Sequence, residues 1–102
     1  MDIAVAQTGD SLRITLNGQI DEYGSDELKT RLGELDTSTL KDVTFDFGGV
    51  NRIGSSGIGR LLLFYKNLSV SGGSMRVENL SPNLFELFQS LKLDTLFPVT
   101  HT

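Results

Sequence analysis

The N-terminal part of the chain alternates apolar and polar residues before it changes to a helical spacing. Apolar side chains occupy every second position within 3–5 and again within 12–16, on either side of a polar turn at 8–11. This period of two predicts a pair of half-buried antiparallel strands. Leucines at spacings of four and three across 28–35 then predict an amphipathic helix, with Ser25 as its N-cap.

The middle of the chain has the pattern of a strand, a helix and a second strand. Apolar and polar residues alternate across 43–47, and the glycines at 48–49 predict the end of that strand and a following loop. A helix is expected from Ser56 to the breakers at 71–73, and a short strand at 75–77. The two strands of such a βαβ unit lie parallel. The side of the helix expected to face the core carries Ile58, Leu61, Leu62, Tyr65 and Leu68.

The C-terminal segment predicts another helix. Ser81 is a suitable N-cap and Pro82 fits the first helical position. The apolar stripe after them consists of Leu84, Leu87, Phe88 and Leu91. Residues 96–99 are expected to add an edge strand or to pack as a tail. Together the elements predict an α/β fold with a single domain over residues 1–102, in which helices pack against a mixed sheet of four to five strands.

Composition narrows the classes of partner. Nine basic residues against thirteen acidic ones give a net charge of -4, so neither DNA nor RNA is an expected partner. No window reaches the roughly 20 apolar residues of a membrane span, and the N-terminus lacks the features of a signal peptide. We therefore expect a cytoplasmic protein without membrane insertion, monomeric when free. The absence of cysteine excludes disulfides and thiolate metal sites.

Little in the sequence points to catalysis. His101 is the only histidine and lies beside the C-terminus, so we interpret it as a tail residue and expect neither a catalytic triad nor a histidine metal site. An acidic cluster around the start of the first helix has three interpretations: a solvated helix start, a partner contact or a metal site. The cluster comprises Asp21, Glu22, Asp26 and Glu27. We expect no catalytic residue, no cofactor and no bound metal.

The most unusual segment is Gly-Ser-Ser-Gly-Ile-Gly at 54–59, between a strand and a strongly apolar helix. In a structural interpretation, Ser55 or Ser56 caps the helix and the glycines allow close packing on the sheet. Nucleotide binding is a poor alternative, because the third glycine of the dinucleotide-binding fingerprint would fall on Leu62. The third interpretation is a phosphorylation switch, since a helix N-terminus favours the negative charge of a phosphate.

Four segments in this order resemble the STAS domain, the family of bacterial anti-sigma-factor antagonists and of the cytoplasmic domains of sulfate transporters. They are Leu-Asn-Gly-Gln-Ile-Asp at 16–21, the alternating strand at 43–47, Ser-Ser-Gly-Ile-Gly with two leucines at 55–62, and Leu-Lys-Leu-Asp-Thr-Leu-Phe at 91–97. Each is weak alone, and the order and spacing make the match fairly specific. The resemblance covers almost the whole chain.

The resemblance implies a regulatory cycle in which the domain is substrate and ligand. In antagonists of this family, the first serine of the loop, here Ser55, is phosphorylated by an anti-sigma factor that is also a GHKL-type serine kinase. The unphosphorylated form binds that kinase and releases its sigma factor, phosphorylation ends binding, and a PP2C-type phosphatase restores it. Leu63 and Phe64 lie off the predicted core-facing stripe; they are candidate partner contacts, although burial is an alternative and is expected for Leu63. The expected switch-loop and partner-binding residues are Asp21, Gly54, Ser56, Gly57, Ile58, Arg60 and Phe64.

One position departs from the family pattern. Where the family usually has aspartate immediately before the phosphorylated serine, this chain has Gly54. The change removes a carboxylate able to order the loop or contact the kinase. A second function therefore stays open: a STAS subunit that binds another protein constitutively, such as a transporter ATPase or a signalling assembly, with Ser55 unmodified.

Overall fold

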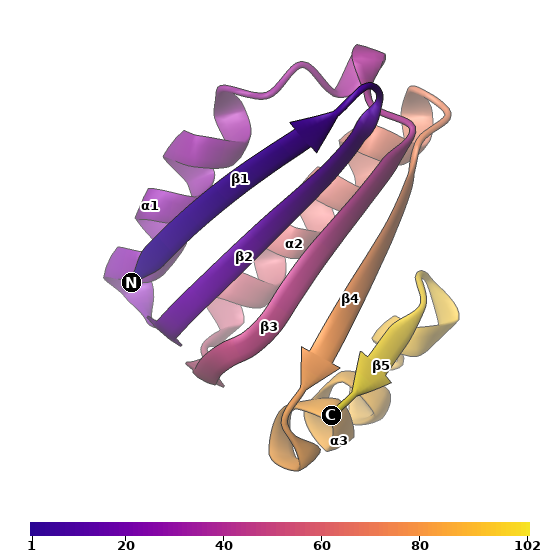
Figure 1. Ribbon diagram of the computed structural model, residues 1–102. Coiled ribbons are helices and arrows are strands. Elements are labelled where there is room, and N and C mark those ends of the chain that lie inside the picture. The colour runs from indigo at the N-terminus through magenta and orange to yellow at the C-terminus, as the bar shows by residue number, and fades with distance from the viewer.

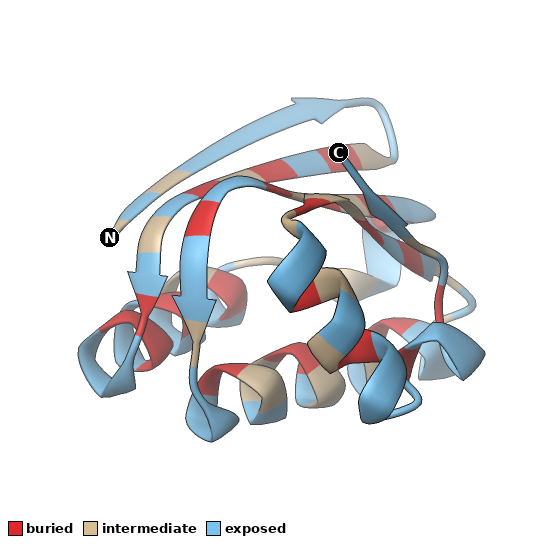
Figure 2. Ribbon diagram, turned by 90° about the horizontal axis from the view of Figure 1, so that it is seen from below, coloured by how far each residue is buried: buried red, intermediate tan, exposed pale blue.

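All three α-helices pack against the same face of one five-stranded sheet (Figures 1 and 2). The computed structural model describes residues 1–102. The strand order is β1-β2-β3-β4-β5; β1 runs antiparallel to β2, and the other neighbours are parallel. The elements are β1 (Asp2–Thr8), β2 (Ser11–Ile20), α1 (Glu22–Gly33), β3 (Asp42–Ile53), α2 (Ser55–Val70), β4 (Ser74–Leu80), α3 (Pro82–Ser90) and β5 (Val99–His101), with short 3₁₀ helices at Thr37–Thr39 and Leu93–Thr95.

The topology follows from two repeated crossovers. The helices α1 and α2 each connect a strand to its parallel neighbour, and both connections advance across the sheet in the same direction. Because such crossovers are right-handed, both helices fall on one face. The predicted α/β class, the antiparallel start and the parallel βαβ unit are confirmed. None of the helices is both long and apolar enough to cross a membrane.

The core lies between the sheet and the helices. Alternate side chains of β2, β3 and β4 point toward the helices, as the period of two requires, and 21 apolar residues are buried in the core. The edge strand β1, predicted to be half-buried, has no buried residue. The central strand β3 contributes two rings that meet aromatic partners edge to face. Phe45 lies 5.7 Å from Phe64 of α2, and Phe47 lies 5.8 Å from Phe88 of α3, between ring centroids. These contacts anchor both helices to the middle of the sheet.

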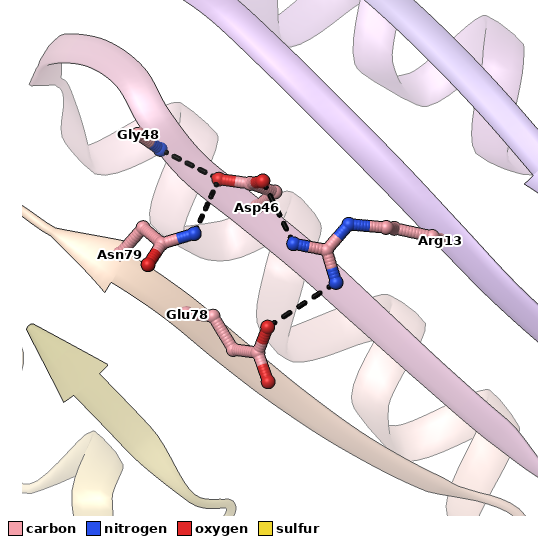
Figure 3. A network of polar contacts seen from close by, with 5 residues as sticks. All are labelled: Arg13, Asp46, Gly48, Glu78 and Asn79. Carbon is pink, nitrogen blue, oxygen red and sulfur yellow. Dashed lines mark hydrogen bonds and ion pairs between the residues drawn. The ribbon is translucent and has the colours of Figure 1, made fainter.

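The opposite face of the sheet is uncovered and carries a polar network across three strands (Figure 3). Arg13 of β2 donates to Asp46 of β3 at 2.8 Å and to Glu78 of β4 at 3.2 Å. Asp46 also accepts from the Gly48 amide at 2.9 Å and from the side chain of Asn79 at 3.0 Å. Burial raises the pKa of Asp46, but these three hydrogen bonds outweigh it and hold the pKa below its ordinary value. The network joins neighbouring strands where no helix covers them.

The first helix starts earlier than predicted. Asp21 is the N-cap, and its carboxylate accepts a hydrogen bond from the Gly24 amide at 2.9 Å. Ser25, the predicted cap, lies inside the helix with its side chain buried, and its hydroxyl has no hydrogen-bond partner. The prediction was wrong because Asp21, directly after β2, already has the extended backbone that a cap needs.

The sequence predicted that β3 ends at the two glycines, and this prediction was wrong. It continues to Ile53, and Gly49 and Val50 pair with Asn17 and Gly18 of β2. The parallel neighbour supplies hydrogen-bond partners to the glycine backbone, and this tertiary pairing outweighs the low strand propensity of glycine. The longer strand replaces most of the predicted loop and runs almost to α2, which starts at Ser55, one residue before the predicted start.

The helix α2 differs from the prediction on the side that faces α1. Phe64, expected off the core-facing stripe, is only 4% exposed, whereas Leu63, expected to be covered, is 50% exposed. The buried positions of α2 are Gly57, Leu61, Phe64 and Leu68. Ile58, Leu62 and Tyr65 are partly buried at the border of the core. The buried side of α2 is thus shifted by about one residue from the predicted side, toward α1.

The C-terminal segment agrees with the sequence at its start and differs at its end. Ser81 caps α3 by accepting from the Leu84 amide, with Pro82 at the first helical position, as predicted. Leu91 lies after the helix and is exposed rather than part of the stripe. An edge strand forms as β5, but it shares only Val99 with the predicted segment 96–99. His101 is its last residue, with its ring centroid 4.7 Å from that of Phe85. His101 is therefore an exposed residue of a paired strand and not a free tail.

Candidate functional site

The serine segment lies where two parallel strands end at the same edge of the sheet. β2 ends at Ile20 and leads into α1, and β3 ends at Ile53 and leads into α2. The Gly54 amide donates to the Ile20 carbonyl at 2.9 Å, so the last sheet hydrogen bond lies directly before the serines. Asp21 and Gly54 are therefore the N-caps of neighbouring helices. The carboxyl edge of a parallel sheet is a common place for a binding site.

Ser55 and Ser56 are the first two residues of α2, and both are exposed. The predicted capping role is wrong for both, because Gly54 occupies the N-cap position and no side chain caps the helix. The first helical hydrogen bond runs from the Ile58 amide to the Gly54 carbonyl at 3.1 Å. The N–H groups of Ser55, Ser56 and Gly57 thus precede the helical ladder and give this end a partial positive charge. An exposed hydroxyl in this position can accept a phosphate without disturbing the core.

Two other predicted site residues hold the helix against the sheet. Gly57 is buried, and a Cβ added there would lie 2.7 Å from Cγ2 of Ile20 and 2.9 Å from Cγ1 of Ile53. Ile58 is only partly exposed and packs against the core. Both residues therefore set the position of the serine segment more than they offer surface to a partner.

The glycine at position 54 is not required by the local backbone. Its φ of -90° and ψ of 174° are extended values that any residue adopts. A Cβ there would meet only the Ile20 carbonyl oxygen, at 3.7 Å, which is ordinary van der Waals contact. The aspartate that the STAS resemblance implies at this position would fit and would occupy the N-cap of α2.

A hollow of about 410 Å³ ends at Gly54, directly before the serines, and is lined by two residues of opposite charge. Asp21 and Arg52 both line it, together with Gly54. Arg52 was not among the predicted site residues. Its position three residues before Ser55 in the sequence could have indicated that it lies close to the serines. Tyr23 was missed as well: it lies in the first turn of α1 and is 81% exposed. An exposed tyrosine and an arginine are the residue types enriched in protein interfaces.

The predicted site residues do not all gather in one place. The structure brings Asp21, Gly54, Ser55 and Ser56 together at the sheet edge. Two others lie farther along α2: Arg60 and Phe64 line a groove between α1 and α2. Nowhere in the chain do three histidine or acidic side chains come together in a way that would hold a metal ion, so the acidic cluster does not form a metal centre.

Comparisons with known proteins relate almost the entire chain to one family. The family model described as MlaB, STAS domain matches residues 3–98. The anti-sigma-B factor antagonist of Bacillus subtilis (strain 168) is 26% identical over 100 residues, which cover 98% of this chain and 91% of that protein.

Solved structures have the same fold. The crystal structure of an anti-sigma factor antagonist from Mycobacterium paratuberculosis is similar with a TM-score of 0.85 at 22% identity, over 99% of this chain and 86% of that one. The Bacillus cell fate determinant SpoIIAA in its phosphorylated form has a TM-score of 0.76 at 19% identity, over 96% of this chain and 90% of that one. These likenesses concern the fold alone, whereas the family model matches the sequence from the first strand to the residue before β5. The chain belongs to the STAS domain family, and its homologues include the anti-sigma-B factor antagonist.

Proposed function

We propose that this protein is an anti-sigma-factor antagonist that acts by partner switching, as a ligand and substrate and not as a catalyst. The observation that carries the proposal is the exposed, uncapped serine pair at the start of α2, with Ser55 at the first helical position. The homologous anti-sigma-B factor antagonist supports the same class of function. The proposed partner is an anti-sigma factor that is also a GHKL-type serine kinase, in the cytoplasm.

In the unphosphorylated state, the partner binds the sheet edge around Ser55. Asp21 and Arg52 offer a carboxylate and a guanidinium group in the hollow next to Gly54, and the exposed Tyr23 lies in the first turn of α1. Occupation of this surface releases the sigma factor from the anti-sigma factor. The kinase then transfers the γ-phosphoryl group of ATP to the Ser55 hydroxyl oxygen, and ADP leaves.

Phosphorylation ends binding by adding charge at the contact. The open N–H groups and the dipole of α2 stabilise the phosphate within the folded domain. The same phosphate places nearly two negative charges against a surface that had fitted a neutral hydroxyl. A hundredfold weakening of binding requires a loss of only about 2.8 kcal/mol. A PP2C-type phosphatase removes it and restores binding.

Intact-mass spectrometry with ATP and the candidate cognate kinase tests the proposal. We expect the wild type and Ser56→Ala to gain one phosphate and Ser55→Ala to gain none. Binding of the kinase, measured by calorimetry without ATP, should be similar for all three proteins and about a hundredfold weaker for the phosphorylated wild type. A kinase that is active on another substrate but leaves the wild type unmodified would contradict the switch.

The second candidate function is a STAS subunit that binds its partner constitutively. Gly54 favours it, because the aspartate expected before a phosphorylated serine is absent although the backbone would accept it. In that case the same surface binds a partner such as a transporter ATPase or a signalling assembly. The two functions differ in the mass experiment, since a constitutive subunit binds its partner and stays unphosphorylated.

A further inference from the structure

A second candidate binding surface lies between α1 and α2, on the helical side of the molecule. It is an open groove of about 530 Å³, in which Leu32 of α1 and Phe64 of α2 contribute buried side chains. Leu63 and Val70 of α2 also line it, and these side chains are 50% and 82% exposed. Single exposed apolar side chains are normal on a protein surface. Here two of them line the same concave groove above buried apolar side chains, an arrangement found in binding sites.

The spacing of the groove residues suits a helix as occupant. Arg60, Leu63, Asn67 and Val70 follow one another along one side of α2 at intervals of three and four. At 1.5 Å per residue, this stretch is about 15 Å long, or roughly three helical turns. A helix placed beside α1 and α2 would set its own side chains between these at the same intervals.

A glycine keeps the groove open on the α1 side. Gly33 is the last residue of α1 and lines the groove, and a Cβ added there would have no atom within 4 Å. A larger side chain at this position would enter the groove without striking the protein. Gly33 thus offers a means of filling the groove that leaves the core untouched.

The charge of the groove is opposite to that of the whole chain. Lys29 and Arg60 line it and no carboxylate does, although the protein has a net charge of -4. Both cations lie toward the half of the groove nearer the serine segment, and the exposed Val70 lies at the far end. An occupant that matches this arrangement has an apolar side and acidic residues at one end.

We propose that this groove binds an amphipathic helix of a protein partner, with its apolar side on Leu63 and Val70 and its carboxylates near Lys29 and Arg60. The site is separate from the Ser55 surface, and its occupation does not depend on phosphorylation. It gives the domain a second contact, so one partner can engage both surfaces or two partners can bind together.

A titration of the whole ¹⁵N-labelled protein with two synthetic peptides tests this proposal by nuclear magnetic resonance. Both peptides are helices of about four turns with leucines at helical spacing. One has two glutamates at its C-terminal end and the other has two lysines there. We expect the acidic peptide to shift the amide signals of groove residues and to bind at least about tenfold more tightly than the basic one.

Three variants connect any binding to the groove. Gly33→Leu should weaken binding of the acidic peptide about tenfold. The control is Gly59→Leu, at an exposed glycine of α2 where an added Cβ also has no atom within 4 Å. This control should bind the peptide like the wild type. Lys29→Glu leaves Arg60 opposite a carboxylate and should abolish the preference for the acidic peptide. Thermal unfolding of each variant verifies that the fold is kept.

Several outcomes would overturn the proposal. One is no shift in the groove with either peptide, and another is equal binding by Gly33→Leu and the wild type. Decanoate is titrated in the same way. If decanoate shifts the groove signals and the acidic peptide does not, the occupant is a single-chain amphiphile and not a helix. Ser55→Glu should bind the acidic peptide like the wild type, so failure of the phosphorylation switch and failure of the groove are separate results.

Discussion

The two helices that start at the carboxyl edge of the sheet are built differently. α1 starts at Asp21, whose carboxylate accepts from the Gly24 amide at 2.9 Å. α2 starts at Gly54, has no side-chain cap, and presents Ser55 and Ser56 to the surroundings. The first start satisfies one of its free backbone donors with a side chain, and the second satisfies none in this way. An uncapped start is less stable, and it is also the one that can take a phosphate.

The serines of these two helix starts show that residue type alone does not decide function. Ser25 lies inside α1, with its side chain buried and its hydroxyl without a partner. Ser55, at the start of α2, is exposed and accessible to an enzyme. Burial separates the two, and burial depends on where each helix begins relative to the sheet.

Among variants at the two helix starts, Gly57→Ala should have the largest effect on stability. The added methyl group would lie within 3 Å of Ile20 and Ile53, so α2 must move away from the sheet. We expect a loss of about 2 kcal/mol in the free energy of unfolding, measured by urea denaturation. Gly59→Ala is the matched control, because nothing lies within 4 Å of its Cβ and alanine favours a helix. Equal stability of the two variants would contradict the close approach.

Removal of the α1 cap should have a smaller effect. Asp21→Ala leaves the Gly24 amide without its acceptor, and we expect a loss of about 1 kcal/mol in the free energy of unfolding. Asp21→Asn keeps an acceptor oxygen and should lose much less. If both variants lose the same amount, the charge of Asp21 matters and the hydrogen bond does not.

Addition of a cap to α2 should have the smallest effect. Gly54→Asp fits the extended backbone and gives α2 the carboxylate that α1 already has. We expect a gain of a few tenths of a kcal/mol, measured by thermal unfolding. Gly54→Ala fits the same space and accepts no hydrogen bond, so it should show no such gain. A loss of stability in Gly54→Asp would mean that the start of α2 has a different geometry.

Much of the fold was predictable because its signals are local. The alternation around residues 12–16 and 43–47 and the leucine spacing in 28–32 report which side of each element is apolar. Ser81 and Pro82 define the start of α3 from neighbouring residues alone. The order of strand, helix and strand then restricts the topology, since parallel crossovers are right-handed.

The errors fall where distant residues decide the outcome. Glycines 48–49 are strand breakers by propensity, but the pairing of Gly49 with Asn17 of β2 continues β3 beyond them. Phe64 was assigned to the outer side of α2 because the pattern alone does not show where Phe45 lies. The same holds for His101, whose place in the sheet depends on Phe85 and on the β4–β5 pairing.

The sequence by itself determined the fold class, the family and the serine segment as the candidate switch. Tertiary structure alone decided which residues are exposed at that segment, that Arg52 and Tyr23 lie at the same edge, and that a basic, apolar groove exists between α1 and α2. The reason is physical. Periodicity reports the burial of an element against its own core, whereas a surface shared by two elements depends on how those elements pack together.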